Sequence, residues 1–564
     1  DLHGLSEELD TYDLLHEEHR IPTFDGVTLA ADVWRADLPN RTFPVVAIIS
    51  PYFAGAKQRD DNNYPDPDST YAAYIDWFLP RGYAVALVDL RGTRSSGGCV
   101  DLGGPKEQAD AATVVDFLGQ LPWSNGKVGM IGGSYDGWTQ QMAAANTPKH
   151  LAAIIPIAPV ADWYHVVGKG GAKYQGWTPH SPLLYNYEIG VNQHDPYDID
   201  HLTHQHCLVV NQAGSNDFTG DYNAWMRERD IREKAKDARA PMLYVHGFAD
   251  VNARPDHIDP WYNNYGGPKR GFLWQMDHAQ PNAANTGRGD DFRRLAIQWM
   301  DYHLLGLPNG INGTYGLVEV QDNFGRWRLE TSWPPADLVE TRFALAPGAI
   351  HIATNDTPAP TRSVGGLLGL GLATQAETMR LRDNPFEDGQ AFGARDARME
   401  STASDSRLVF RSGVLEEDIH YAGRPAVHLR VEADRPQAQY VVRLYDVSPD
   451  GSWTLLNRGV ATLRHRNGPD TAEAAAPATL YTVKAAMQPN DYVFPKGHAI
   501  GITVTASDMN YVYSSPAYAM STVHFDGAEG SALVLPVIAR DTFTETSWGG
   551  DQPSWMGPRE EARR

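Results

Sequence analysis

A single serine stands at a glycine-rich turn between an apolar run and a helix-forming run, and this arrangement is typical of a nucleophile. The segment is KVGMIGGSYDGWTQQM (127–142), in which two glycines precede Ser134. A strand that turns sharply into a helix exposes such a hydroxyl, and the helix N-terminus adds N–H groups where an oxyanion would form. The strict G-x-S-x-G pattern fails, because Asp136 holds the second position after the serine and glycine comes one residue later, at Gly137.

The nucleophile needs two partners. A serine hydroxyl is a poor nucleophile at neutral pH, so a base must take its proton and a carboxylate must orient that base. In one common arrangement, the nucleophile comes first along the chain, then the acid, then the histidine. The acid and the histidine each follow a later strand of the sheet. Asp250 comes just after the apolar run MLYVHG, and His278 just after FLWQM. We therefore expect Ser134, Asp250 and His278 to act together. Other candidates for the two roles are Asp256, His257 and Asp277, whereas we expect His246 and His303 to be structural.

An oxyanion needs two hydrogen-bond donors. The backbone N–H of Tyr135 follows the nucleophile and is one of them. A second would come from the loop after the first parallel strand, where Tyr52 lies in the sequence SPYF (50–53). A tyrosine hydroxyl can donate in place of a backbone amide. The alternative for Tyr52 is a half-buried aromatic side chain at a strand end, and the sequence leaves both open.

Apolar and amphipathic runs alternate around these residues. After a hairpin at 20–36 centred on Asp25-Gly26, we expect strands at 44–50, 83–90, 128–132, 151–159, 240–247 and 271–276. We expect helices at 71–79, at 106–121, from Tyr135 onward, and at 291–306 with Gly306 as the C-cap. This alternation predicts a parallel sheet with helices on both faces, the α/β class.

The alternation stops twice. Residues 161–238 are rich in Trp, Tyr, His, Gly and Asp, then in helix formers (225–236), which indicates a cap inserted between sheet strands. Beyond about residue 340, short alternating strands separated by Pro, Gly, Asn and Asp predict an antiparallel sandwich or jelly roll. We therefore divide the chain into an α/β domain in two parts (1–160 and 239–339), a cap (161–238) and a C-terminal β domain (340–564).

The composition limits the partners. A chain of 564 residues is too long for one hydrophobic core, so two or three domains are expected. The formal net charge of −22 disfavours nucleic acid and anionic membrane surfaces as partners. No run of about 18 apolar residues occurs, so we expect no transmembrane helix.

The two cysteines, Cys99 and Cys207, are either separate thiols or one disulfide, and we expect the disulfide. The chain begins at Asp1 without an initiator methionine or a signal peptide, which is typical of a processed or trimmed chain. With low lysine use beside 15 Trp and 26 Tyr, this favours a secreted or cell-envelope protein, with the cytoplasm as the alternative.

These motifs resemble the Xaa-Pro dipeptidyl-peptidase and cocaine-esterase family, which also includes α-amino-acid ester hydrolases and glutaryl acylases. The matching segments cover nearly the whole chain: SPY (50–52), DLRGTRSSGG (89–98), PWSNGKVGMIGGSYDG (122–137), HGFAD (246–250), DH (277–278), RWRLETSWPP (326–335), LYDVSPDG (444–451) and FPKGHAIGITVTASD (494–508). The resemblance implies an α/β-hydrolase core with a helical cap and a C-terminal jelly-roll-like domain. It also implies a triad of Ser134, Asp250 and His278, with an oxyanion hole from the Tyr52 hydroxyl and the Tyr135 N–H. Members often carry an acidic residue after the oxyanion tyrosine, whereas this chain has Phe53.

Recognition of the substrate is expected to fall to the cap. A free amino terminus needs buried acidic partners, and a hydrophobic acyl or proline group needs apolar walls. The candidate substrate contacts are Phe53, Asp162, Trp163, Trp177 and Trp225, with Asp195, Asp198 and Asp200 as further acidic residues. The alternative for the aromatic residues is a place in the core. Metal binding by His201, His204 and His206 is a weak alternative, because their spacing lacks the H-E-x-x-H pattern, and we expect no metal.

These observations predict a serine hydrolase that cleaves an amide or ester bond through an acyl-enzyme, most similar to an Xaa-Pro dipeptidyl-peptidase. The first alternative is a carboxylesterase or acylase of the cocaine-esterase or α-amino-acid ester hydrolase type. The second is a binding protein whose β domain recognises glycans or a surface, with a vestigial triad. We expect a small-molecule or short-peptide substrate and no cofactor. The sequence leaves the oligomeric state open, a homo-oligomer included.

Overall fold

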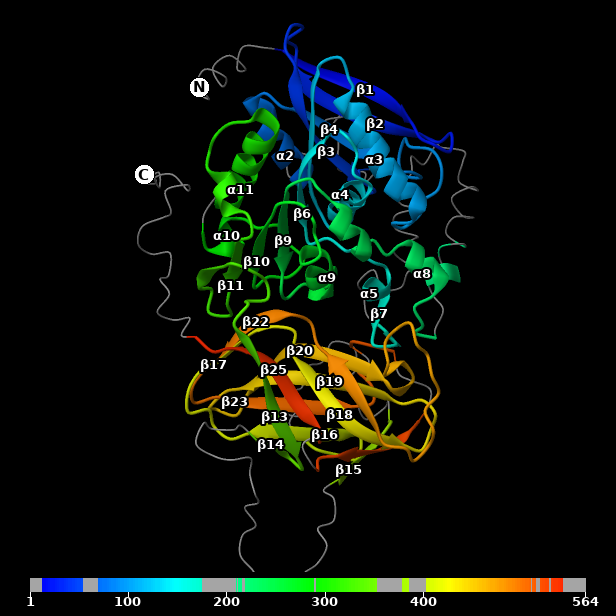
Figure 1. Ribbon diagram of the computed structural model, residues 1–564, viewed down its shortest axis with the longest axis vertical. Helices are drawn as coiled ribbons and strands as arrows, with labels where there is room; N and C mark the ends of the chain where they lie inside the picture. The colour runs from blue at the N-terminus through cyan, green and yellow to red at the C-terminus, as the bar shows by residue number, and fades with distance from the viewer. Residues whose placement is uncertain are drawn as a thin grey trace, which may run out of the picture.

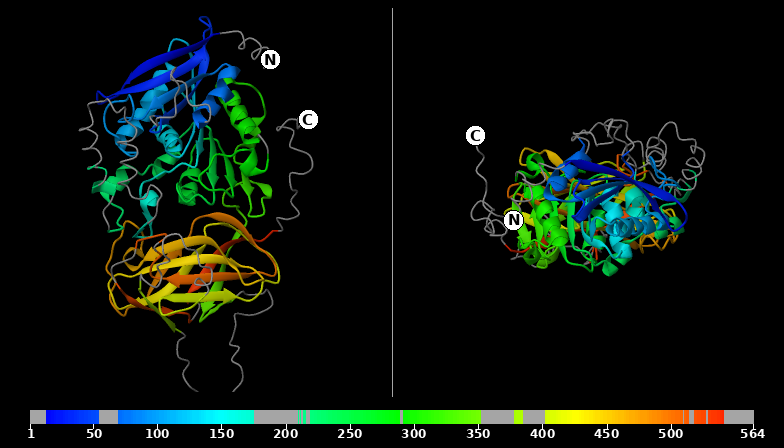
Figure 2. Two further views of the ribbon diagram at one scale, coloured as in Figure 1. Left: turned by 180° about the vertical axis from the view of Figure 1, so that it is seen from behind. Right: turned by 90° about the horizontal axis from the view of Figure 1, so that it is seen from above.

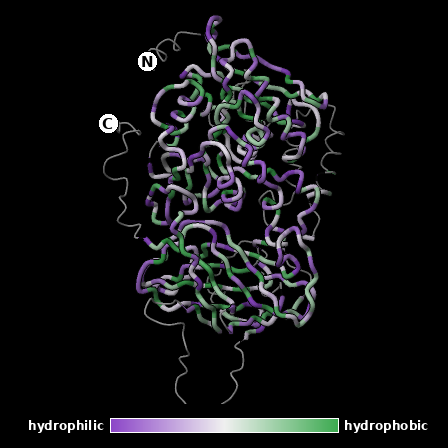
Figure 3. The backbone as a smooth tube through the Cα atoms, viewed as in Figure 1, coloured by the Kyte–Doolittle hydropathy of each residue, from purple (hydrophilic) through white to green (hydrophobic). Residues whose placement is uncertain are grey.

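The chain forms an α/β body and an all-β body, stacked along the longest axis of the molecule (Figure 1, Figure 2). The computed structural model describes residues 13–53, 69–174, 209, 211, 213–215, 219–288, 291–351, 378–384, 402–508, 510–513, 518–526 and 529–540. Hydrophobic stretches run through the interior of both bodies (Figure 3).

The α/β body is built on a mixed sheet with the strand order β1-β2-β4-β3-β5-β6-β9-β10-β11-β12. Its strands are β1 Leu14–Pro22, β2 Thr28–Ala36, β3 Phe43–Ser50, β4 Ala84–Asp89, β5 Ser124–Gly133, β6 Leu151–Ile157, β9 Met242–Gly247, β10 Lys269–Trp274, β11 Val318–Gln321 and β12 Trp327–Glu330. Neighbours from β4 to β11 run parallel, so their carboxyl ends meet at one edge. The predicted hairpin is confirmed as the antiparallel pair β1–β2.

Helices cover both faces of this sheet, as predicted. The helices of the α/β body are α2 Thr70–Phe78, α3 Pro105–Gly119, α4 Tyr135–Asn146, α9 Ile258–Tyr262, α10 Ala283–Thr286 and α11 Asp291–Met300. The buried side chains of α3 and α4 pack on one face, and those of α2 and α11 on the other. Because both faces are covered, β3 is buried along its whole length, which explains its unbroken apolar run.

One predicted helix and one run of helix formers differ from a single continuous helix. The helix expected to end at Gly306 is α-helical only to Met300 and continues as a π-helical segment, Asp301–Leu305, before Gly306 adopts a left-handed conformation (φ 74°). The run of helix formers at 225–236 does not form one helix but contributes to α8 Ala224–Glu228 and a 3₁₀ segment, Arg232–Asp237. The break falls at Arg229, which is 3% exposed and turns inward to pair with Asp101 at 2.7 Å. Other described parts of the inserted segment are α5 Tyr164–Val167, β7 Gly168–Lys169 and β8 Ala172–Lys173.

The second body, called the β domain below, contains β13 to β25 and no α-helix among its described residues. Its strands are β13 Leu338–Ala346, β14 Ala349–His351, β15 Thr378–Arg382, β16 Arg407–Ser412, β17 Ile419–Gly423, β18 Ala426–Ala433, β19 Gln439–Val447, β20 Trp453–Thr462, β21 Tyr481–Ala486, β22 Asn490–Phe494, β23 Ala499–Thr505, β24 Met520–His524 and β25 Ala532–Ile538. Their pairing is antiparallel except between β14 and β16. The largest apolar cluster among its described residues includes side chains from Phe343 to Leu535.

One buried carboxylate joins three parts of the chain. Asp256, which follows β9, is 2% exposed, and its Oδ1 pairs with Lys169 of β7 at 2.6 Å. The same oxygen pairs with Arg424, which lies between β17 and β18. Lys169 and Arg424 also donate to the carbonyl oxygen of Met487, at 2.9 and 3.0 Å. The inserted segment, the α/β body and the β domain therefore meet at Asp256.

Within the described part of the chain, no helix is long and apolar enough to cross a membrane.

Candidate active site

Ser134 occupies a strained turn between β5 and α4. Its backbone has φ 60° and ψ −123°, which a residue with a side chain adopts only where the surroundings hold it. Its N–H donates to the carbonyl oxygen of Ile157 at the end of β6, at 2.8 Å. A Cβ at Gly137 would lie 3.0 Å from Cβ of Pro159. The tight contact favours glycine at Gly137, one residue later than the strict motif, because the first turn of α4 packs against the chain leaving β6.

Asp250 and His278 form a hydrogen-bonded pair at the same edge of the sheet. Asp250 follows β9 and is fully buried, and its Oδ2 lies 2.7 Å from Nδ1 of His278, which follows β10. Its other oxygen accepts the N–H of Asn252 at 2.7 Å. A carboxylate at Nδ1 keeps the proton on that nitrogen, so Nε2 is left as the basic atom. No hydrogen bond of the Ser134 hydroxyl is found among the described residues. Such contacts often tighten only when substrate binds.

The surroundings of His278 shift its pKa. Burial opposes its charged form, but the hydrogen bond and the charge of Asp250 outweigh burial, and the pKa of His278 is raised above its usual value. The neighbouring Asp277 adds to this shift and also ties the two loops together. Its Oδ1 accepts the N–H of His278 at 2.7 Å and that of Val251 at 3.2 Å.

The rival residues have other partners. Nε2 of His246 donates to the carbonyl oxygen of Ala253 at 2.7 Å, and burial lowers the pKa of His246 to about 3, so this residue is a neutral core histidine. Nδ1 of His257 accepts the N–H of Ala161 at 3.2 Å, which joins two loops. Asp256 is held by Lys169 and Arg424, as described above. His303 packs on the ring of Trp299, with a centroid distance of 4.8 Å.

The loop that carries Tyr52 is fastened to the first turn of α4. The N–H of Tyr52 donates to Oγ of Ser50 at 3.1 Å, and this hydroxyl lies 3.0 Å from the hydroxyl of Tyr71 on α2. Tyr71 in turn donates to Oδ2 of Asp136 at 3.0 Å. Tyr52 is half-buried beside this chain of bonds. This series of hydrogen bonds links the loop after β3 with the turn that carries Ser134.

Tyr135 is held by a second buried carboxylate. Its hydroxyl donates to Oε2 of Glu107 on α3 at 2.5 Å, and Glu107 also accepts the N–H groups of Asp101 and Gly103, at 2.5 and 2.7 Å. Burial raises the pKa of Glu107 to about 7, and the charge of Asp101 adds to this effect. The Tyr135 side chain is thus fixed in the core while its backbone stays at the turn.

Asp136 has a larger role than its position suggested. The sequence indicates a carboxylate that favours the helix N-terminus, but the side chain is 4% exposed and accepts the Tyr71 hydroxyl. Burial raises its pKa to about 7, although the hydrogen bonds from Ser50 and Tyr71 oppose the shift. Tyr71 and Glu107 have no motif around them, so sequence reasoning missed both. Their link to the site depends only on how α2 and α3 pack.

We expect Asp136→Asn to stabilise the protein at pH 8 more than at pH 5. The folded chain holds the Asp136 proton up to about pH 7, whereas the unfolded chain releases it near pH 4, so this group's contribution to stability is lost as the pH rises through that window. Asparagine removes the titration, and the gain in thermal midpoint should differ by about 2 °C between the two pH values, because a chain of 564 residues has a large unfolding entropy.

Thermal unfolding followed by circular dichroism at both pH values measures this difference. Asp76→Asn, which removes an exposed carboxylate from α2, is the matched control for the change in net charge. Equal shifts at pH 5 and pH 8 for Asp136→Asn would contradict the raised pKa.

Two of the candidate substrate contacts, Phe53 and Trp163, are buried, and Trp225 is half-buried. Phe53 is 3% exposed and meets the ring of Tyr71 edge-on, with a centroid distance of 4.7 Å. Trp163 is 1% exposed and lies between Trp138 and Trp225, at centroid distances of 6.0 and 5.6 Å. Trp225 is half-buried under the guanidinium of Arg229. Trp177, Asp195, Asp198, Asp200 and the three histidines His201, His204 and His206 lie outside the described residues.

Asp162 is a fully buried carboxylate whose charge is matched inside the protein. Oδ1 pairs with Nδ1 of His165 at 2.9 Å, and Oδ2 lies 3.5 Å from both Arg232 and His257. Burial opposes its charge, yet His165 and Arg232 hold the pKa of Asp162 well below its usual range. A substrate ammonium at Asp162 would have to compete with these neighbours.

Cys99 is disulfide-bonded, and the sequence has one other cysteine, Cys207, which lies outside the described residues. Disulfides are typical of proteins that work in oxidising compartments.

Two family models match the chain in succession. Residues 25–280 match the X-Pro dipeptidyl-peptidase (S15 family) model, and residues 309–543 match the X-Pro dipeptidyl-peptidase C-terminal non-catalytic domain. The first match contains Ser134, Asp250 and His278, and the second contains every strand of the β domain.

Relatives of similar length bear two kinds of name. A Bacillus cereus protein whose name assigns it provisionally to the Xaa-Pro dipeptidyl-peptidases is 27% identical over 532 residues, which cover 89% of this chain and 85% of that protein. The cocaine esterase of a Rhodococcus species is 26% identical over 599 residues, covering 92% of this chain and 98% of the esterase.

Two solved structures align over nearly the whole chain. An aminopeptidase from a marine sediment archaeon of the Thaumarchaeota has a TM-score of 0.71 at 18% identity, over 94% of this chain and 97% of that one. An α-amino acid ester hydrolase has a TM-score of 0.70 at 19% identity, over 93% and 97%. At these identities the likeness shows the shared fold alone.

Proposed function

The chain belongs to the X-Pro dipeptidyl-peptidase (S15) family of serine hydrolases, and we propose that it cleaves an amide or ester bond through an acyl-enzyme on Ser134. The observation that carries this proposal is the strained turn at Ser134 together with the bonded pair Asp250 and His278. All three follow strands whose carboxyl ends meet at one edge of the sheet.

In the proposed reaction, Oγ of Ser134 bonds to the carbonyl carbon of the substrate while Nε2 of His278 takes the hydroxyl proton. Asp250 orients the imidazole and stabilises its charged form. The oxyanion accepts hydrogen bonds from the N–H of Tyr135 and the hydroxyl of Tyr52. His278 then returns the proton to the leaving amine or alcohol as the C–N or C–O bond breaks. Water hydrolyses the acyl-enzyme with His278 again as base.

The leaving group separates two versions of this proposal. Both family models bear the name of the X-Pro dipeptidyl-peptidases, which favours an amide after a penultimate proline. The cocaine esterase relative, which this chain covers almost completely, favours an ester or acylase activity. The internal pairing of Asp162 with His165 and Arg232 also favours the second version, because that carboxylate is already neutralised.

An assay with paired substrates tests the peptidase version. The peptidase version predicts turnover of Gly-Pro-anilide, and a loss of about 10⁴-fold in kcat/KM when its amino terminus is acetylated, because a site that pairs with an ammonium rejects an analogue that lacks it. A short-chain nitrophenyl ester serves as the control for an intact nucleophile. Hydrolysis of the ester without the anilide would eliminate the peptidase and leave the esterase or acylase.

A further inference from the structure

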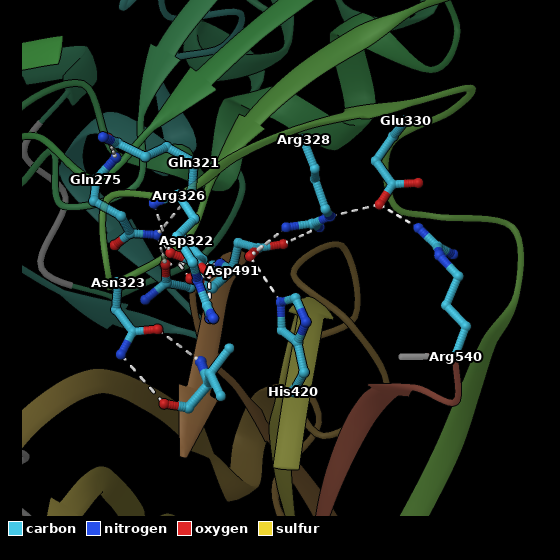
Figure 4. Close-up of polar contacts among 12 residues, drawn as sticks. Gln275, Gln321, Asp322, Asn323, Arg326, Arg328, Glu330, His420, Asp491 and Arg540 are labelled. Atoms are coloured by element: carbon cyan, nitrogen blue, oxygen red, sulfur yellow. Dashed lines mark hydrogen bonds and ion pairs between the residues drawn. The ribbon is translucent and has the colours of Figure 1, made fainter. Parts of the chain in front are cut away.

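The loop that carries His278 is attached to the β domain through one side chain. Gln275 lies between the end of β10 and His278. Its Nε2 donates to Oδ1 of Asn490 at 3.0 Å and to the carbonyl oxygen of Asp491 at 2.7 Å, both at the start of β22 (Figure 4). The backbone N–H of Gln275 donates to Oε1 of Gln321 at 3.1 Å. The residue three positions before the proposed base is therefore fixed by a strand more than 200 residues away in sequence.

The start of β22 is itself a firm anchor. Asp491 is fully buried and receives two hydrogen bonds from the guanidinium of Arg328 on β12, one of them at 2.8 Å. Its Oδ1 also pairs with Nε2 of His420 on β17 at 2.9 Å (Figure 4). Nε of Arg328 donates to Glu330 at 2.6 Å. Charge-assisted and bidentate bonds of this kind are the stronger hydrogen bonds of proteins, so Gln275 binds to a part of the β domain that is held in place.

The other anchors of the loop come from the α/β body. Asp277 reaches the N–H of Val251 in the loop of the proposed acid. Gln280 donates to the hydroxyl of Tyr74 on α2 at 2.5 Å. Among the described residues, Gln275 is the one side chain of the segment 275–280 that makes a hydrogen bond to the β domain. The position of His278 is thus set from two bodies at once.

We propose that Gln275 is a positioning residue, through which strand β22 of the β domain holds His278 in register with Asp250 and Ser134. The inference rests on the proposed role of His278 as the base. It makes the β domain part of the machinery for proton transfer, although none of the proposed reacting groups, Ser134, Asp250 and His278, lies in that domain.

The test compares Gln275→Ala with a matched control, Asn323→Ala. Asn323 lies in the turn between β11 and β12 and also makes two bonds to β22, accepting the N–H of Val493 at 2.8 Å and donating to its carbonyl oxygen at 3.2 Å. Both variants remove two hydrogen bonds between the same two bodies, but only Gln275 adjoins the His278 loop. We expect Gln275→Ala to lower kcat by about 10–100-fold with KM nearly unchanged, because a small misplacement of a catalytic group has an effect of this size. Asn323→Ala should stay within about threefold of the wild type.

The pH profile separates positioning from a general loss of stability. Asp250 raises the pKa of His278, so a looser pair lowers that pKa, and the acid limb of the kcat profile should move to lower pH in Gln275→Ala alone. Equal profiles, or equal losses of kcat in the two variants, would overturn the proposal. The Ser134→Ala variant, assayed on the same substrate, judges the proposed function separately. If Ser134→Ala retains turnover, the proposed triad is refuted, independently of the result for Gln275→Ala.

A second pair of variants carries the test if Gln275→Ala does not fold. Asn490→Ala removes an acceptor from the β-domain side, and Asn490→Asp keeps an oxygen in its place. We expect a loss of about threefold to tenfold in kcat for the first and near wild-type kcat for the second. Equal kcat for the two variants would overturn the proposal.

Discussion

Replacing Ser134 by alanine is expected to lower kcat by about 10⁴–10⁶-fold, because the proposed acyl-enzyme has no other atom on which to form. The backbone strain at Ser134 does not change, since alanine keeps the Cβ that defines it. The folded structure should therefore survive, and the thermal midpoint should remain close to that of the wild type. Steady-state turnover of the anilide and the ester measures the loss.

A serine-reactive fluorophosphonate probe gives a second measurement on the same protein. It should label the wild type at Ser134 and leave the variant unlabelled. Ser124→Ala is the matched control, because this half-buried serine lies at the opposite end of β5. A Ser134→Ala protein that keeps its turnover would refute the hydrolase mechanism. A folded wild type that resists the probe would instead favour the binding protein with a vestigial triad.

The second large effect is expected at Asp250. Asp250→Asn should lower kcat by about 10⁴-fold while the fold persists, because an amide can donate to Nδ1 of His278 and stabilise the wrong tautomer of the imidazole. Nε2 would then carry the proton and could not accept one from Ser134. Single-turnover acylation, which isolates the first chemical step, measures this effect directly.

Asp277→Asn is the natural comparison for Asp250→Asn. In the wild type, Oδ1 of Asp277 accepts backbone N–H groups, those of His278 and Val251. The amide oxygen of an asparagine can accept the same two hydrogen bonds. We expect this variant to stay within about tenfold of the wild type. Similar losses of kcat in the two variants would mean that Asp250 is not the only carboxylate that orients His278.

Local pattern predicts only part of this site. Strand ends can be located from apolar runs, and the carboxyl ends of parallel strands share one edge, so the sequence alone places Asp250 and His278 near Ser134. The displaced glycine at Gly137 is visible in the sequence too. The reason for a glycine at this position cannot be read from the sequence, because it depends on the close approach of Pro159, which follows β6.

Contacts between distant elements could not be predicted. Tyr71 meets Asp136 across 65 residues, and Gln275 meets Asn490 across 215, with no periodicity to mark either pair. Helix propensity at 225–236 is overridden because Arg229 turns inward to Asp101. The acidic character of the inserted segment suggests a site for an ammonium, but it does not reveal that Asp162 already has His165 and Arg232 as partners.

The meeting of three chain segments at Asp256 limits how this protein can be recombined with its relatives. A chimera that exchanges the β domain must supply both a cation where Arg424 stands and a carbonyl oxygen where that of Met487 stands. Without them, Lys169 and Asp256 remain buried with part of their partners missing, and breaking a buried ion pair costs about 3–5 kcal/mol. A grafted β domain should therefore keep Arg424 and Met487, and the recipient chain should keep Lys169 and Asp256. The boundary between the two bodies is therefore an unfavourable crossover point for chimeras.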